Sequence, residues 1–211
     1  MTIYDDISTS VQTGKKNDVE KLVQQAISEG LPAQDILSNG LMAAMDIIGP
    51  KFKNNEIFVP EVLIAARAMN AGTALLKPLL AKEGTASRGK ALIGTVKGDM
   101  HDIGKNLVRM MVEGKGIEVT DLGVDVTSEA FIEYIKSHDD LQLVCFSALL
   151  TTTLPALEAA VKAVVDAGLT SQVKVLVGGA PVTQEFANQI GAHGYAPDAA
   201  SAAEKAVELL A

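Results

Sequence analysis

The chain has 211 residues, a net charge of −8, 48 % apolar residues and 21 % charged residues. This length predicts one large domain or two small ones, with enough apolar residues for a buried core. The acidic balance argues against a broad nucleic-acid surface, which needs a basic field. Neither a run of 18 apolar residues nor a signal-like start is found, so we expect a cytoplasmic protein without a membrane span. The single cysteine, Cys145, lies in an apolar run and is predicted to be a buried structural thiol.

Residues 1–83 have the apolar spacing of helices. One predicted helix begins with Asn17 as its cap, and another begins with Pro60 in its first turn. About four helices without heptads predict a small four-helix bundle. The stretch 84–90 is rich in glycine and small polar residues and is predicted to be a linker to a second domain, 91–211.

In the second domain, short apolar runs alternate with amphipathic helical patterns. Strict alternation of strand and helix predicts an α/β fold, a doubly wound five-stranded parallel sheet of the Rossmann or flavodoxin type. The predicted strands are 91–96, 118–123, 143–148, 174–179 and the shorter 194–197, and the helical patterns include 103–114, 128–138, 154–168 and 183–192.

Three of the predicted strands end in residues that are unusual for a plain loop. In parallel sheets, ligands bind beyond the carboxyl ends of the strands, so these three loops should converge on one site. The residues are Asp99 and His101 after the first strand, Ser147 and Thr151 after the third, and Gly178 and Gly179 after the fourth.

Several kinds of site can be tested against the stretch from Gly98 to Asn106. A phosphate loop needs a different glycine spacing and a Ser or Thr after its lysine, where this chain has Asn106, and the dinucleotide fingerprint is absent. A phospho-accepting receiver domain would need clustered acids and no histidine. Two alternatives stay open: a divalent metal held by Asp99, His101 and Asp102, and an exposed loop histidine that caps the next helix.

The motifs resemble those of the cobalamin-binding proteins that use a histidine as the lower cobalt ligand. Asp99-x-His101-x-x-Gly104 is followed by Ser147-Ala148-Leu149 and then by Gly178-Gly179, in the order and at the separations of that family. The stretch 49–69 is similar to the helical cap that precedes this domain in methionine synthase and in stand-alone methyltransferase corrinoid proteins. The resemblance therefore covers nearly the whole chain.

The resemblance implies roles for individual residues. His101 would ligate cobalt, and Asp99 and Thr153 would form a relay behind it, with Thr153 in place of the family's serine; a plain helix cap is the alternative for Thr153. Gly178 and Gly179 would leave room for the nucleotide tail. Phe52 and Val59 would shield the methyl face, unless they are bundle core, and Val59 replaces a larger leucine of methionine synthase. The implied cobalamin contacts are Gly98, Asp99, Met100, His101, Asp102, Ile103, Gly104, Ser147, Leu149, Thr151, Gly178, Gly179, Ala199, Phe52 and Val59.

The function that the resemblance implies is that of a methyl carrier rather than a complete enzyme. The cofactor would alternate between methylcobalamin and cob(I)alamin, serving a substrate:corrinoid methyltransferase and a corrinoid:acceptor methyltransferase, with a reductive activator as a further partner. The acceptor would be tetrahydrofolate or a thiol coenzyme, and the donor methanol, a methylamine, a betaine or an aromatic methyl ether. The alternatives are a mutase subunit, a cobalamin-sensing regulator and a binding module for another ligand.

Overall fold

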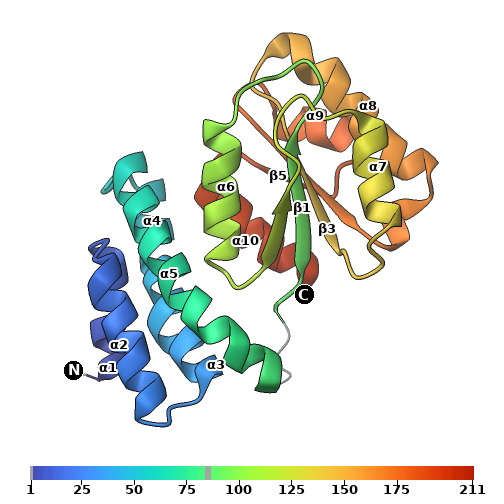
Figure 1. Cartoon of the computed structure of the whole chain (residues 1–211). Helices are drawn as coiled ribbons and strands as arrows, with labels where there is room; N and C mark the ends of the chain where they lie inside the picture. The colour runs from blue at the N-terminus through green and yellow to red at the C-terminus, as the bar shows by residue number, and fades with distance from the viewer. Residues whose placement is uncertain (1, 84–86) are drawn as a thin grey trace. The chain divides into compact units, whose positions relative to one another are not determined.

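The computed structural model describes residues 2–83 and 87–211 and divides into two compact units. One is helical, Met1–Ser87 with Gly114–Gly116, and the other is an α/β unit, Arg88–Glu113 with Ile117–Ala211 (Figure 1). The predicted linker 84–90 falls partly on residues 84–86, which lie outside the described residues. Each unit has its own apolar core.

The helical unit contains four consecutive helical segments, as the apolar spacing predicts. The third segment changes from α to π geometry and back, and α2 packs against α5. Gly72 permits this close packing, because a Cβ at this position would lie 2.8 Å from Leu41 and 3.0 Å from Val19. The segments are α1 (Ile3–Gln12), α2 (Lys16–Ser28), α3 (Ala33–Asp35) with the π-helix η1 (Ile36–Met42) and α4 (Ala43–Lys53), and α5 (Val59–Glu83).

The predicted cap at Asn17 is wrong. Helix α2 begins at Lys16 after the N-cap residue Lys15, which makes no side-chain capping bond, so Asn17 lies within the first turn. The reason is the turn before the helix: Gly14 has a φ of +68°, and the chain enters the helix directly after it.

The α/β unit is built on a five-stranded, all-parallel sheet with strand order β2-β1-β3-β4-β5. This confirms the predicted fold class and all five predicted strands. The strands are β1 (Lys90–Thr95), β2 (Glu118–Asp121), β3 (Leu143–Ser147), β4 (Lys174–Gly178) and β5 (Gly194–Ala196), and the α-helices are α6 (Ile103–Glu113), α7 (Ser128–Lys136), α8 (Leu154–Asp166), α9 (Gln184–Gln189) and α10 (Ala199–Leu210).

Helices cover both faces of this sheet. Helices α6 and α10 pack against each other on one face, and α7 and α8 do so on the other (Figure 1). Phe131 of α7 and Phe146 of β3 meet edge to face, with ring centroids 4.6 Å apart. Gly94 on β1 makes room for this pair, since a Cβ there would lie 2.5 Å from the Phe131 ring. The chain therefore leaves β1 toward one face and the neighbouring β3 toward the other, which opens a crevice at their carboxyl ends.

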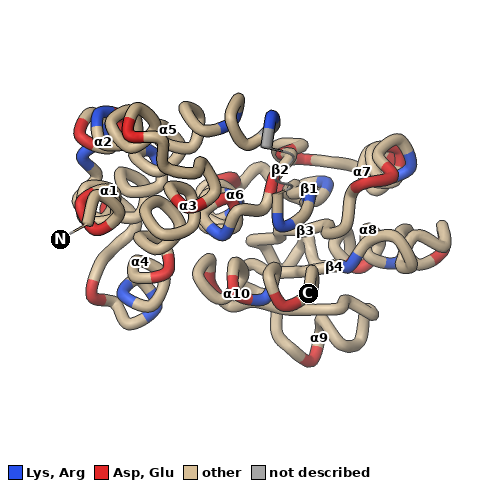
Figure 2. Tube along the Cα trace, turned by 90° about the horizontal axis from the view of Figure 1, so that it is seen from below, with Lys and Arg blue, Asp and Glu red and all other residues tan. Residues whose placement is uncertain are grey.

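Three further predictions from the sequence, on Cys145, on membrane spans and on charge, can be compared with the structure. Cys145 is buried on β3, as predicted, and burial raises the pKa of its thiol to about 12. Among the described helices, none is long and apolar enough to cross a membrane. Acidic and basic residues are interspersed along the helices of both units (Figure 2).

Candidate functional site

The site is centred on Asp99, which is completely buried in the loop after β1. Its Oδ1 accepts hydrogen bonds from the Nδ1–H of His101 at 2.7 Å and from the His101 amide at 3.1 Å. Its Oδ2 accepts one from the Leu149 amide at 2.7 Å and one from the Thr153 hydroxyl at 2.9 Å. The two bonds to Oδ2 join the loop after β1 to the loop after β3, so these two predicted loops converge.

These bonds keep Asp99 ionised. Burial by itself raises the pKa of a carboxyl group, but the amide of Leu149, the ring and amide of His101 and the hydroxyl of Thr153 all favour the carboxylate. The hydrogen bonds outweigh burial, and the pKa of Asp99 lies well below its ordinary value. Asp99 is therefore a fixed negative charge, and each of its two carboxylate oxygens accepts two hydrogen bonds.

His101 presents its other nitrogen outward. Its side chain is 50 % exposed, and Nε2 has no hydrogen-bond partner among residues 2–83 and 87–211. Because Asp99 accepts at Nδ1, the proton of the neutral imidazole is placed there and the lone pair on Nε2. The backbone carbonyl of His101 in turn accepts from the Thr95 hydroxyl at 2.9 Å, which anchors the residue to the end of β1.

Thr153 contacts Asp99 rather than capping a helix. It is 5 % exposed and is the N-cap residue of α8, yet its side chain makes no capping bond to that helix. The hydroxyl lies 2.9 Å from Asp99 Oδ2 and also 2.9 Å from the carbonyl of Leu150. The geometry thus brings His101, Asp99 and Thr153 together in the order of the predicted relay.

The glycine pair lies at the end of β4, beside Ser147 in the parallel register. Gly179 has a φ of +126°, and a Cβ there would lie 1.8 Å from the Ala148 carbonyl oxygen. A Cβ on Gly178 would lie 3.0 Å from the Ala196 carbonyl oxygen. Gly179 is therefore required by the backbone of the neighbouring loop, independently of any ligand.

Exposed apolar side chains lie near His101 in the chain and in the loop after β3. Met100 and Ile103, within two residues of His101, are 69 % and 73 % exposed, and Leu149 and Leu150 are 41 % and 39 % exposed. Such a cluster next to a histidine nitrogen suits a ligand with a broad apolar surface and a metal atom that lacks one ligand.

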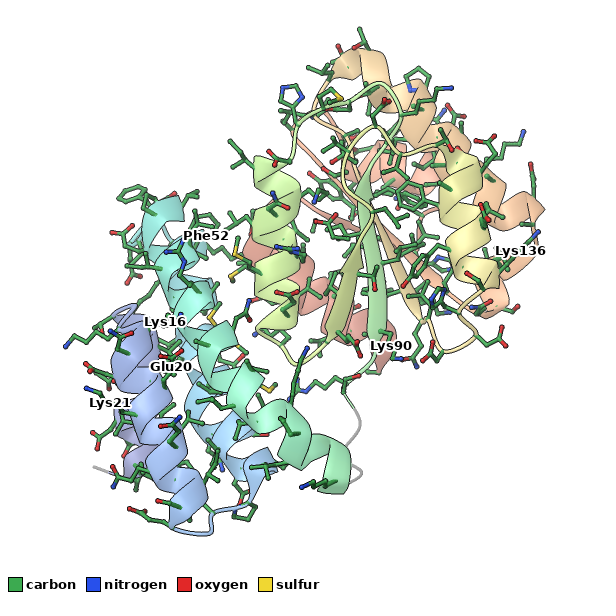
Figure 3. All side chains as sticks on the ribbon, in the orientation of Figure 1. Lys16, Glu20, Lys21, Phe52, Lys90 and Lys136 are labelled. Atoms are coloured by element: carbon green, nitrogen blue, oxygen red, sulfur yellow. The ribbon has the colours of Figure 1, made fainter. Side chains whose placement is uncertain are left out.

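The other predicted contacts lie in different places. Asp102 is exposed and accepts from the Asn106 side chain at 3.1 Å, and Thr151 is exposed at the start of the turn before α8. Ala199 is 6 % exposed in the first turn of α10, after β5. Phe52 lies on α4 (Figure 3) and Val59 at the start of α5, and both are half-buried in the helical unit. Their role as a cover stays a prediction.

Comparison with known proteins identifies the family. A B12 binding domain model matches residues 89–204, and a second B12 binding domain model matches residues 3–77. The chain belongs to the B12-binding corrinoid proteins. It is 42 % identical over 211 residues to dimethylamine corrinoid protein 1 of Methanosarcina acetivorans, covering 99 % of this chain and 98 % of the relative.

One further relative and one solved structure bear on function. The trimethylamine corrinoid protein of Methanosarcina barkeri is 40 % identical over 188 residues, 88 % of this chain and 86 % of that protein. A chain in the crystal structure of the methanol:cobalamin methyltransferase complex MtaBC of Methanosarcina barkeri is 28 % identical, with a TM-score of 0.85, and covers 99 % of this chain and 79 % of that chain. These full-length similarities favour a corrinoid carrier over a mutase subunit or a regulator.

The donor set of this corrinoid protein fits cobalamin better than a bare divalent ion. Both oxygens of Asp99 are occupied by hydrogen bonds, and one oxygen of Asp102 is engaged by Asn106. Among the residues that the structure describes, no three His, Cys, Asp or Glu side chains are grouped to hold a metal. A single free imidazole nitrogen among apolar side chains is what a corrin ring requires, since the ring supplies its own equatorial ligands.

Sequence reasoning missed two contributors to this corrinoid site, and one ion pair elsewhere. Leu150 adds an exposed apolar side chain to the site. The ion pair joins the buried Lys105 of α6 to Asp121 at the end of β2, at 2.5 Å. Asp125, in the loop after β2, contacts the loop of Asp99 directly. The pattern "DLGVDV" offers only a general signal for Asp125, because aspartate is one of the few residues that tolerate a left-handed turn conformation.

Proposed function

We propose that this corrinoid protein binds cobalamin at the carboxyl edge of its sheet, with Nε2 of His101 as the lower ligand, and carries a methyl group between two methyltransferases. The observation that supports this most strongly is the chain from the Thr153 hydroxyl through the Asp99 carboxylate to the His101 ring. When bound, the corrinoid supplies a cobalt atom that accepts and releases a methyl group.

The protein's own residues would set the strength of the ligand. Asp99 holds the Nδ1 proton, which fixes the tautomer and orients the ring. Leu149 and Thr153 hold the opposite oxygen of Asp99, so the carboxylate cannot rotate away from the histidine. Met100, Ile103 and Leu150 would exclude water from the corrin ring when the cofactor is bound.

The methyl donor that we propose is a methylamine. Two relatives named for dimethylamine and trimethylamine are 42 % and 40 % identical, whereas the chain from the methanol complex is 28 % identical. The exposed apolar side chains near His101, Met100 and Ile103 among them, offer no hydrogen-bond partner to a small amine. Donor recognition is therefore assigned to the partner methyltransferase.

The partners follow from the same proposal. The related chain in the methanol complex is found with a cobalamin methyltransferase, and we assign this chain a comparable substrate methyltransferase. A second methyltransferase would pass the methyl group to a thiol coenzyme or tetrahydrofolate, and a reductive activator would restore oxidised cobalt. Residues 1–83 are proposed as the cap, 84–90 as the linker and 91–211 as the cobalamin domain, with Phe52 and Val59 shielding the methyl face.

The test is a reconstituted methyl transfer. The cobalamin-loaded, reduced protein is mixed with dimethylamine, trimethylamine or methanol, each with and without its methyltransferase, and the cobalt absorption spectrum is followed. We expect fast methylation only with an amine and its methyltransferase. Methylation by methanol and its methyltransferase, with none by either amine and its methyltransferase, would overturn the donor assignment. Rapid demethylation of a free substrate without a methyltransferase would overturn the role as a carrier.

A further inference from the structure

The loop after β2, residues 122–126, runs beside the loop that carries Asp99. Its two ends are hydrogen-bonded to β1 and the residue after it. The Thr95 amide donates to the Gly123 carbonyl at 3.0 Å, and the Val126 amide donates to the Thr95 carbonyl at 3.0 Å. Val126 also pairs with Val96 as an isolated parallel bridge. The segment between these anchors is therefore held in a fixed position against the site.

Asp125 lies in the middle of this segment and makes two hydrogen bonds to the site loop. Its Oδ1 accepts from the Gly98 amide at 2.7 Å. Its own amide donates to the Asp99 carbonyl at 3.0 Å. The backbone is thus held on both sides of the Asp99 α-carbon, while the Asp99 amide donates to Val96 at 3.1 Å. Asp99 has little freedom to shift its carboxylate away from His101.

The backbone of Asp125 is in an unusual conformation. Its φ is +53°, and Asn55 is the only other non-glycine residue with a positive φ in the described part of the chain. Aspartate and asparagine tolerate this region, although glycine does so with less strain. Asp125 is exposed, so no packing demands a side chain there. A function for the carboxylate explains why this position is not glycine.

We propose that Asp125 is a positioning residue for the cobalt ligand: by holding Gly98 and Asp99, it keeps the Asp99 carboxylate in the place where it orients His101. This role rests on the proposed function. A purely structural turn residue would change only the stability of the protein. A positioning residue also changes the bonds that Asp99 makes and the ligation of cobalt by His101.

Two substitutions separate the carboxylate from the backbone conformation. Asp125→Gly keeps the left-handed conformation and removes the acceptor for Gly98. Asp125→Asn keeps both, because its side-chain oxygen still accepts and asparagine tolerates positive φ, and it is the matched control. Should Asp125→Gly not fold, Asp125→Glu keeps the charge while moving the acceptor, and it is read in the same way.

The first readout uses the protein without cofactor. The Leu149 amide donates to Asp99 Oδ2, so its hydrogen exchange reports the position of that carboxylate. The Val96 amide, which donates to the Ser147 carbonyl, is the internal reference. We expect Asp125→Gly to exchange at Leu149 roughly tenfold faster, which corresponds to about 1.4 kcal/mol. The control should exchange like the wild type.

The second readout is equilibrium binding of hydroxocobalamin to protein with ¹⁵N-labelled histidine, with the ¹⁵N hyperfine doublets of the cobalt(II) form as a measure of histidine ligation. We expect Asp125→Gly to bind roughly tenfold more weakly and to lose part of the histidine signal. Wild-type Leu149 exchange and ligation in Asp125→Gly, with or without a loss of stability, would overturn the positioning role. If the wild type itself binds cobalamin without a histidine nitrogen, the proposed function fails instead.

Discussion

Replacing Gly179 by alanine should destabilise the α/β unit before any cofactor is added. The new Cβ would lie 1.8 Å from the Ala148 carbonyl oxygen and 2.8 Å from its carbon, both of which are backbone atoms that no rotamer change can move. The backbone of Gly179 also has a φ of +126°, which alanine adopts only with strain. Overpacking and backbone strain each cost about 1–3 kcal/mol, so the combined loss is roughly 2–6 kcal/mol.

The measurement is urea unfolding of the cofactor-free protein, and Gly104→Ala is the matched control. Both glycines belong to the predicted cobalamin contacts, but a Cβ on Gly104 meets no atom within 4 Å and its φ is not positive. Gly104 lies in the first turn of α6, where alanine should be neutral or stabilising by up to about 1 kcal/mol.

Unchanged stability in Gly179→Ala would refute this reasoning. If cobalamin binding were then lost, Gly179 would serve to leave room for the nucleotide tail, as its place in the motif first suggested. A large loss of stability, by contrast, means that Gly179 substitutions cannot be used to locate the tail.

Two further predictions concern groups near the sheet. Lys105→Met should lower the free energy of unfolding in urea by about 3 kcal/mol, because Lys105 is 2 % exposed and its loss leaves Asp121 with the Gly123 amide and the more distant Arg109. Adding Asp121→Leu should recover part of this loss. Unchanged stability in Lys105→Met would contradict a stabilising ion pair. Burial, with a smaller contribution from Lys174, lowers the pKa of His193, whose Nδ1 accepts from the Val175 amide at 3.0 Å. The contribution of His193 to stability is therefore present above about pH 6.5 and is lost as the pH falls further. His193→Asn should flatten this part of the pH–stability curve, and an unchanged slope would show that His193 does not cause it.

The sequence predicted those elements whose pattern is set by their own residues. The apolar runs of β1 to β5 and their alternation with helices were sufficient for the sheet, since each central strand is covered on both faces. Helix α10 was not predicted: its repeated alanines carry little contrast between faces, although Asp198 caps it by accepting from the Ser201 amide at 2.8 Å. The π-helix Ile36–Met42 has the apolar spacing of an ordinary helix and was predicted as one.

The residues of the site also fall into those that a local pattern predicts and those whose contacts depend on the fold. Asp99, His101 and Thr153 were predicted from a motif, and the structure brings them together through two loops. Asp125 was missed because its contact to Gly98 joins residues that no local pattern connects. For Gly179 the motif indicated the residue but not the reason, which depends on the Ala148 carbonyl of a neighbouring loop. Contacts that depend on strand order could be found only after the sheet was known.

The proposed function depends above all on whether a nitrogen of His101 ligates cobalt. The protein is prepared with ¹⁵N-labelled histidine, loaded with hydroxocobalamin and reduced to the cobalt(II) form for electron paramagnetic resonance. We expect labelling to change each nitrogen triplet to a doublet, since the histidine replaces the cofactor's own base, and we expect His101→Ala to abolish the labelled pattern. Triplets that persist in the labelled protein, or a labelled pattern that survives in His101→Ala, would contradict His101 as the ligand.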